Sequence, residues 1–205
     1  MELVARPGSS CVALSSAVIA GLFIVEAGTY NAVFIRRVLP AEGKDHLKLP
    51  FALTFNVLLG LALLSYMRAR CGNPGTVPQR WQEFVGEVGD LLPIAPSRFE
   101  WQPGKATYCS SCGVPRPERA HHCRICGVCI LRMDHHCPWL SNCVGFRNHK
   151  YFLLSVVYSF LTCVVGLCTS LPELVRCVEL LARREDSSRL GRRWPLTVVD
   201  HYMLT

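Results

Sequence analysis

The chain has 205 residues, half of them hydrophobic, and a mean hydropathy of +0.25. This hydropathy is high for a soluble domain, so membrane-spanning segments are expected and a wholly water-soluble protein is disfavoured. The formal net charge of +7 suits nucleic acid, acidic lipid or a phosphate-rich ligand, and charge alone does not distinguish among these three.

The first predicted element is a transmembrane helix at residues 11–35, a run with one charged residue, Glu26. At about 1.5 Å per residue the run can cross a hydrocarbon core of about 30 Å. A cleaved signal peptide is the alternative, but the run is long for a signal core and no small-residue cleavage site follows closely. We interpret Glu26, Tyr30 and Asn31 as a polar patch that forms interhelical hydrogen bonds.

Two later apolar runs predict two further transmembrane helices. Residues 51–67 are uncharged, and leucines just before them extend the predicted helix to 48–67. A buried soluble helix is the alternative for so short a run. The third run gives a predicted helix at 151–171, and Pro172 is expected to end it.

Between the second and third runs lies an insert with two parts. Residues 68–106 contain scattered proline and glycine and are predicted to be a cytosolic linker with one surface helix. Residues 107–150 lose apolar periodicity and are rich in cysteine and histidine. Basic residues flank the insert, which places it in the cytosol by the positive-inside rule. The same rule conflicts with the arginine-rich tail at 172–205, which three spans would make lumenal.

The cysteines indicate a metal-binding domain. Seven of the twelve lie between Cys109 and Cys143, interleaved with histidines. Disulfides are the alternative, but interleaved Cys and His favour zinc in a reducing compartment. Two tetrahedral sites would use eight of the twelve Cys and His side chains in the insert. Each of two Cys-x2-Cys pairs, at Cys109 and at Cys123, supplies half a site, and spacing leaves open which downstream residues complete each.

One long motif gives a specific resemblance. The pattern C-x2-C-x9-H-C-x2-C-x2-C-x4-D-H-H-C-x5-C runs from Cys109 to Cys143 and continues into PWLSNCVGFRNHKYF, with Asn148 and Phe152 at family spacing. It resembles the cysteine-rich domain of the DHHC protein S-acyltransferases, the membrane palmitoyltransferases. The implied fold is an α-helical membrane protein of three transmembrane helices, with an irregular, cytosolic, zinc-bound Cys-rich domain at 107–150 between the second and third.

The resemblance implies two bound Zn²⁺ ions, each held by three cysteines and one histidine. The first implied set of ligands is Cys109, Cys112, His122 and Cys129. The second implied set is Cys123, Cys126, His136 and Cys143. His121 and His149 are left over, and we interpret them as surface or supporting histidines.

The same assignment leaves one reactive group free of metal. Cys137 is predicted to be the nucleophile, His135 the base that takes its proton, and Asp134 the carboxylate that orients this imidazole. A free thiol is mostly protonated at neutral pH, so such a base is needed. The alternative is that Cys137 is a ninth ligand that can exchange into a zinc site.

The activity implied by the resemblance is acyl transfer from palmitoyl-CoA, through a Cys137 thioester, to proteins with membrane-proximal cysteines. The implied location is a Golgi or endoplasmic reticulum membrane. The candidates for binding the CoA phosphates are basic residues of the insert: Arg124, Arg132, Arg147 and Lys150. A nucleic-acid module is disfavoured because no zinc finger with a recognition helix can be built here, so no nucleic-acid partner is expected.

The sequence also departs from the family pattern. Asn73-Pro74-Gly75 stands where the family has Asp-Pro-Gly, and neither a fourth apolar run nor a Thr-Thr-x-Glu signature follows Pro172. These departures predict a shortened member, a fragment or a splice form. The alternative function is therefore a truncated, catalytically inactive member that acts as a membrane binding partner.

Overall fold

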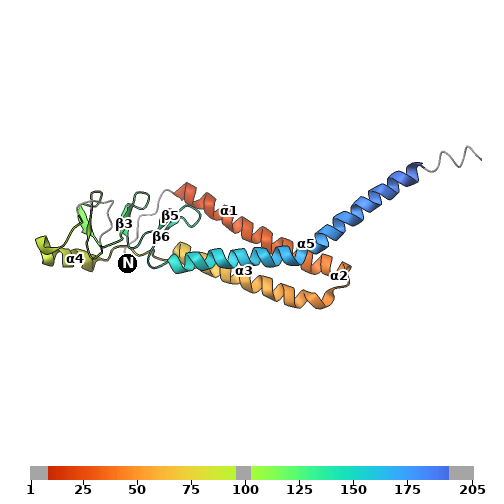
Figure 1. The fold of residues 1–205 in the computed structure, drawn as a ribbon, viewed down its shortest axis with the longest axis horizontal. Helices are drawn as coiled ribbons and strands as arrows, with labels where there is room; N and C mark the ends of the chain where they lie inside the picture. Colours follow the sequence, from red (N-terminus) through yellow and green to blue (C-terminus); the bar gives the residue numbers. More distant parts are fainter. Residues whose placement is uncertain (1–8, 96–102, 194–205) are drawn as a thin grey trace, which may run out of the picture.

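The computed structural model describes residues 9–95 and 103–193, which form a bundle of long helices with a small Cys/His-rich domain at one end (Figure 1). The helices are α1 (Ser9–Gly28), η1 (Thr29–Val38), α2 (Leu39–Ala41), η2 (Asp45–Leu47), α3 (Lys48–Cys71), α4 (Gln79–Val88), η3 (Gly89–Leu91) and α5 (His149–Arg193). The strands are β1 (Thr107–Cys109), β2 (Val114–Arg116), β3 (His121–Cys123), β4 (Val128–Ile130), β5 (His135–Cys137) and β6 (Asn142–Val144).

Three helical segments are long and apolar enough to cross a membrane, as predicted. They are Ala17–Ala41, Asp45–Cys71 and His149–Arg183. The Cys/His-rich domain lies between the second and third. It is less irregular than expected, because its six strands pair into three antiparallel hairpins.

The bundle core joins the first segment to the other two. The Tyr30 ring stacks on Phe55 of α3 with centroids 3.8 Å apart, and its hydroxyl lies 2.9 Å from Thr169 Oγ1 of α5. The amides of Asn31 and Asn56 bond each other reciprocally at 3.1 and 2.8 Å. The polar patch in the first segment therefore forms the interhelical contacts that the sequence predicted.

The first membrane segment changes from α-helix to π-helix at Thr29, which the sequence did not predict. Near this change the Thr29 hydroxyl donates to Val25 O (2.6 Å) and the Asn31 amide donates to Ala27 O (2.9 Å). Side chains that bond the carbonyl four residues back compete with the α-helical ladder, and this competition favours a wider turn.

The expectation that the third helix ends at Pro172 is wrong. The helix α5 continues through Pro172 to Arg193, and Figure 1 shows that it bends where it leaves the bundle. Proline in a helix removes one N–H donor and commonly causes a kink. The hydroxyls of Thr169 and Ser170 donate to Val165 O (2.7 Å) and Gly166 O (2.6 Å) in the preceding turn, which satisfies these hydroxyls within the helix. Residues 194–205 of the predicted tail lie outside the described residues.

Two asparagines join the Cys/His-rich domain to the bundle. The Asn142 amide donates to the carbonyls of Ala69 (3.1 Å), Arg70 (3.0 Å) and Gly72 (2.8 Å) at the end of α3. Asn148 is 1% exposed and donates to Ala69 O and Cys143 O. The last carbonyls of a helix lack partners within the helix. Here the neighbouring domain supplies those donors, so its position is fixed relative to α3.

The segment that follows α3 explains the departure at Asn73. Its side-chain oxygen accepts hydrogen bonds from the backbone N–H groups of Gly75 (2.7 Å) and Thr76 (3.1 Å). This turn needs only an acceptor oxygen, so an amide serves where the family has a carboxylate. Gly75 has φ +106°, and its carbonyl accepts a hydrogen bond from Leu131 N. The turn is therefore retained despite the changed residue.

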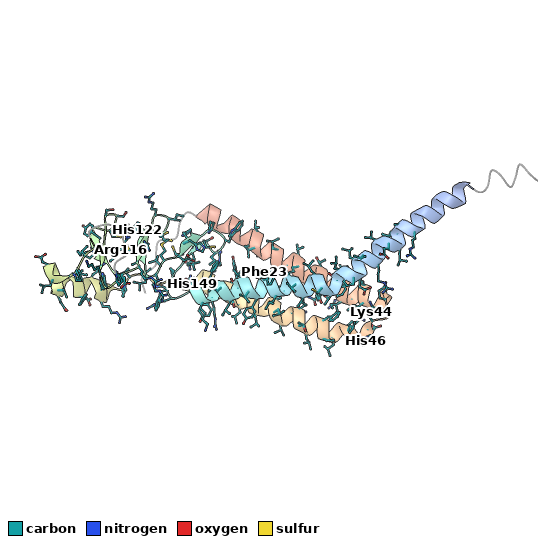
Figure 2. All side chains as sticks on the ribbon, viewed as in Figure 1. Phe23, Lys44, His46, Arg116, His122 and His149 are labelled. Carbon is teal, nitrogen blue, oxygen red and sulfur yellow. The ribbon has the colours of Figure 1, made fainter. Side chains whose placement is uncertain are left out.

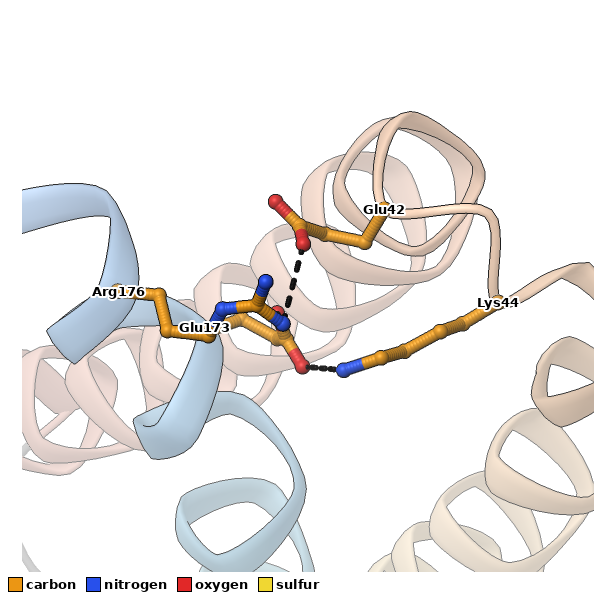
Figure 3. Close-up of polar contacts among 4 residues, drawn as sticks. All are labelled: Glu42, Lys44, Glu173 and Arg176. Atoms are coloured by element: carbon orange, nitrogen blue, oxygen red, sulfur yellow. Dashed lines mark hydrogen bonds and ion pairs between the residues drawn. The ribbon is translucent and has the colours of Figure 1, made fainter. Parts of the chain in front are cut away.

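At the opposite end of the bundle, four charged side chains connect α5 to the loop before α3 (Figure 3). Glu173 is 7% exposed and pairs with Lys44, while Arg176 lies 3.3 Å from Glu42 and 3.8 Å from Glu173. Among the described residues Glu173 Oε2 has no hydrogen-bond partner. Lys44 is therefore the main partner of a buried carboxylate.

We expect Lys44→Met to lower the free energy of unfolding by about 1–3 kcal/mol, less than for a fully buried pair because Lys44 is partly exposed. Thermal unfolding in detergent measures this change. Lys48→Met is the matched control, since its partner Asp45 is exposed, and it should have little effect. If the two variants melt at the same temperature, Lys44 is not the stabilising partner of Glu173.

Candidate metal centres and reactive cysteine

The three hairpins place the candidate ligands by strand register. In β3–β4, His122 pairs with Cys129, and in β5–β6, His136 pairs with Cys143. Paired residues of antiparallel strands point to the same side of the sheet. Each of these two hairpins therefore brings one histidine and one cysteine together, and the Cys-x2-Cys turn of the preceding hairpin supplies the remaining two thiols.

The strand β3 contributes to both clusters. Successive side chains of a strand point to opposite faces, so His122 points to one cluster and Cys123 to the other. The first cluster is Cys109, Cys112, His122 and Cys129. The second cluster is Cys123, Cys126, His136 and Cys143. These are the two sets that the family resemblance implied.

The spacing within each cluster fits a tetrahedral metal ion. The ligand atoms of each lie within 4.8 Å of one another. In the second cluster the Cys126, Cys143 and Cys123 sulfurs lie 3.4, 3.5 and 3.6 Å from His136 Nδ1. Zinc bonds of about 2.3 Å to sulfur and about 2.0 Å to nitrogen give ligand–ligand edges of roughly 3.5–3.8 Å. Three thiols and one imidazole are also a donor set typical of structural zinc.

The thiols of each cluster differ in how easily they ionise. Burial, together with neighbouring thiols, raises the pKa of Cys129 to about 12, and it also raises the pKa of Cys143. Burial raises the pKa of Cys112 and Cys126 as well, whereas hydrogen bonds to the sulfur outweigh burial at Cys109 and Cys123 and lower the pKa there. Burial lowers the pKa of His136, which keeps this imidazole neutral as a ligand must be. Without a metal ion, two thiols of each cluster would therefore stay protonated at neutral pH.

Cys137 belongs to neither cluster. It follows His136 in β5, so its side chain points away from the second cluster. Its thiol is 5% exposed and lies in an apolar group with Ala69, Leu140 and Val144. Tyr151 and Phe152 at the start of α5 pack against the same group. This cysteine therefore lies where the domain meets the ends of α3 and α5.

The loop that follows Cys137 is held by α3, which the sequence reasoning missed. The Tyr66 hydroxyl donates to Trp139 O (3.0 Å), and the Arg70 guanidinium donates to Leu140 O (3.2 Å). Both donors lie in the last turns of α3. There the sequence reasoning treated Tyr66 only as part of an apolar run and Arg70 only as a basic residue that orients the run. Their partners lie about 70 residues away in the chain, and no local pattern predicts such contacts.

Asp134 and His135 are close to each other beside this cysteine. His135 Nδ1 lies 3.3 Å from Asp134 Oδ2, and strand alternation puts His135 on the same face of β5 as Cys137. The His135 ring packs edge-on against Phe152, 5.4 Å between centroids. A carboxylate at Nδ1 favours the tautomer whose Nε2 is free to accept a proton.

A cavity of about 1130 Å³ adjoins Asp134, and its wall is basic. The cationic side chains that line it are Arg116, Arg119, Arg132 and Lys150. Of the basic residues expected from sequence to bind phosphate, Arg132 and Lys150 line the cavity, whereas Arg124 and Arg147 do not. The sequence reasoning missed Arg116, Arg119 and His121, which lie upstream in the chain. Figure 2 shows Arg116 within the small domain and His149 where it meets the bundle.

These features define a class of protein. In the described part of the chain, three helices are long and apolar enough to cross a membrane, and two metal-capable clusters and a separate buried cysteine lie between the second and third. Comparison with known families specifies the class further. Residues 102–187 match the family model described as DHHC palmitoyltransferase, and the chain belongs to this family.

Individual relatives agree with the family. The chain is 40% identical over 121 residues to probable protein S-acyltransferase 12 of Arabidopsis thaliana, covering 59% of this chain and 41% of that protein. It is 34% identical over 159 residues to probable protein S-acyltransferase 14 of the same plant, covering 72% and 52%. It is 38% identical over 150 residues to palmitoyltransferase ZDHHC3 of Homo sapiens, covering 72% and 45%. The chain thus spans about half the length of these relatives.

We expect metal affinity to fall as pH falls. The thiol of Cys129 has its pKa raised to about 12 in the metal-free protein, so each ion bound near neutral pH must displace protons. Competition for zinc with a chromogenic chelator between pH 6 and pH 8 measures this dependence. Wild-type protein should hold two ions per chain, and Cys137→Ala should still hold two. An affinity independent of pH, or fewer ions in the Cys137 variant, would contradict these assignments.

Proposed function

We propose that this protein is a membrane-bound protein S-palmitoyltransferase that transfers a long acyl chain from acyl-CoA to cysteines of substrate proteins. The observation that carries the proposal is the separation of Cys137 from both clusters. Six cysteines and two histidines are grouped in two tetrahedral sets, and the seventh cysteine of this region, Cys137, is left beside His135 at the ends of two membrane helices.

The proposed metal ions have a structural role. Two Zn²⁺ ions bound by the two clusters would crosslink three short hairpins that are too small to fold alone. Because β5 contributes one ligand, His136, fixing this residue also fixes the strand that carries His135 and Cys137. No step of the proposed reaction takes place at either metal ion.

In the proposed first step, His135 Nε2 accepts the Cys137 proton while Asp134 holds Nδ1. The Cys137 sulfur attacks the thioester carbon of acyl-CoA, the bond from that carbon to the CoA sulfur breaks, and the CoA thiolate takes the proton from His135. In the second step a substrate cysteine gives its proton to His135 and attacks the acyl-enzyme, and Cys137 leaves as a thiol. Thioester exchange is nearly balanced, so the protein mainly supplies position and a path for the proton.

The basic cavity is the proposed site for the CoA phosphates. Arg116, Arg119, Arg132 and Lys150 line it, with Asp134 as the acidic residue among those described there. Arginine side chains bind phosphate oxygens in pairs of hydrogen bonds. The position of Cys137 beside the membrane helices supports a substrate whose polar group lies in the cavity and whose acyl chain enters the bilayer.

The remaining parts of the proposal follow the family resemblance. The insert is proposed to face the cytosol, where thiols stay reduced, in a Golgi or endoplasmic reticulum membrane. Protein substrates would carry cysteines close to that membrane face. The alternative is an inactive family member that serves as a binding partner.

Cys137→Ser should abolish acyl-enzyme formation. Wild-type protein in membranes, incubated with a palmitoyl-CoA analogue, is expected to gain a label that hydroxylamine removes. The matched control is Cys71→Ser, because Cys71 is exposed and lies outside both clusters, and it should retain the label. Wild-type protein that never becomes labelled would favour the inactive alternative.

We expect Arg116→Ala and Arg119→Ala each to raise the KM for acyl-CoA several-fold and to leave the rate at saturation little changed, since phosphate contacts contribute to binding and not to thioester chemistry. Arg124→Ala is the matched control, because it removes the same charge from the same domain outside the cavity. Initial rates of label incorporation against acyl-CoA concentration measure both constants. Equal effects from all three variants would indicate general charge attraction in place of a specific site.

A further inference from the structure

His149, which the sequence analysis left without a role, faces the same carboxylate as the proposed base. Asp134 Oδ2 lies 3.3 Å from His135 Nδ1 and 3.8 Å from His149 Nε2. One oxygen atom is thus flanked by two imidazoles, one from β5 and one from α5. His135 carries the proposed proton transfer, while His149 has no part in that step.

The Asp134 carboxylate benefits from a second side-chain partner because much of it is exposed to solvent. The Asp134 backbone is held by a hydrogen bond from its N–H to Val144 O (2.9 Å), but its side chain is 54% exposed. An exposed ion pair with His135 alone contributes little to holding the carboxylate in place. Arg119, Arg132 and Lys150 line the same cavity and compete for the charge. A second fixed partner would keep Oδ2 directed at His135.

His149 is presented by a rigid part of the fold. It is the first residue of α5, and its backbone N–H donates to Gly145 O (2.9 Å). The preceding Asn148 is 1% exposed and bonds both the end of α3 and Cys143. Figure 2 shows His149 at the junction of the small domain and the bundle. Its backbone is therefore fixed at the start of α5, next to a residue that bonds both the end of α3 and the strand β6.

We propose that His149 is a positioning residue, which holds Asp134 on the side opposite His135 so that the carboxylate keeps the base in its productive orientation. This inference rests on the proposed acyl transfer. His149 touches neither the thiol nor the acyl group in this assignment. It acts through Asp134, and it couples the position of the reactive hairpin to the start of α5.

The test compares His149→Ala with His149→Gln in the full-length membrane protein. We expect His149→Ala to slow acyl-enzyme formation at saturating palmitoyl-CoA about tenfold, as small displacements of reacting groups do, with KM within twofold of wild type. Glutamine carries an amide N–H near the position of Nε2, so His149→Gln should recover most of the rate. His46→Ala, at the far end of the bundle (Figure 2), is the unaffected control.

A double-mutant cycle with Asp134 separates positioning from other roles. If His149 acts through Asp134, His149→Ala should slow the Asp134→Ala enzyme no further. Additive losses would overturn the proposal, as would a raised KM with an unchanged saturating rate, which would mark His149 as a phosphate ligand. Two zinc ions per variant confirm that the domain is folded. A wild type without any acyl-enzyme would refute the proposed function itself, whereas a labelled wild type with an indifferent His149 would refute this inference alone.

Discussion

The position of the Cys/His-rich domain relative to the helix bundle depends on hydrogen bonds from two asparagine side chains to the end of α3. Asn142 and Asn148 donate to carbonyls that a helix end leaves unsatisfied. These carbonyls lie where a membrane helix meets water, so polar donors from the neighbouring domain replace solvent at no large cost. Asn142 also pairs with Cys137 in the β5–β6 register. The asparagine that joins the Cys/His-rich domain to the bundle therefore lies directly opposite the proposed nucleophile in this hairpin.

Strand alternation then decides which residues bind metal and which remain reactive. In β5 the consecutive residues His135, His136 and Cys137 would compete for the same ion if they lay in a flexible loop. In a paired strand, only His136 faces the second cluster, and its neighbours face the ends of α3 and α5. A three-residue strand is too short to be stable alone. The metal ions, by crosslinking the hairpins, would maintain the alternation that keeps Cys137 free.

The sequence predicted what depends on composition and on a dense local motif. Long apolar runs indicated three membrane helices. The Cys-x2-Cys spacing indicated metal binding, and the family resemblance of the motif from Cys109 to Cys143 implied the two ligand sets. The sequence did not predict contacts made across the fold. The Tyr66 and Arg70 hydrogen bonds to the loop after Cys137, and the arginines of the basic cavity, depend on the docking angle of the domain. The end of the third helix was misjudged because proline can kink a helix without ending it, and α5 continues through Pro172 with a bend.

The same reasoning relates the location of the site to its chemistry. The Cys137 side chain lies among Ala69, Leu140 and Val144, at an apolar junction beside the helix ends. A fully solvated thiol would lie away from an acyl chain that partitions into lipid. The proposed proton transfer then requires a base and a carboxylate at this same junction. His135 and Asp134 lie at this boundary, with an apolar ring, Phe152, on one side and a basic cavity on the other. The junction between the helix ends and the Cys/His-rich domain therefore offers an apolar surface and a basic surface side by side. This combination suits a thioester with an apolar chain and a phosphate-bearing group better than either part of the protein would alone.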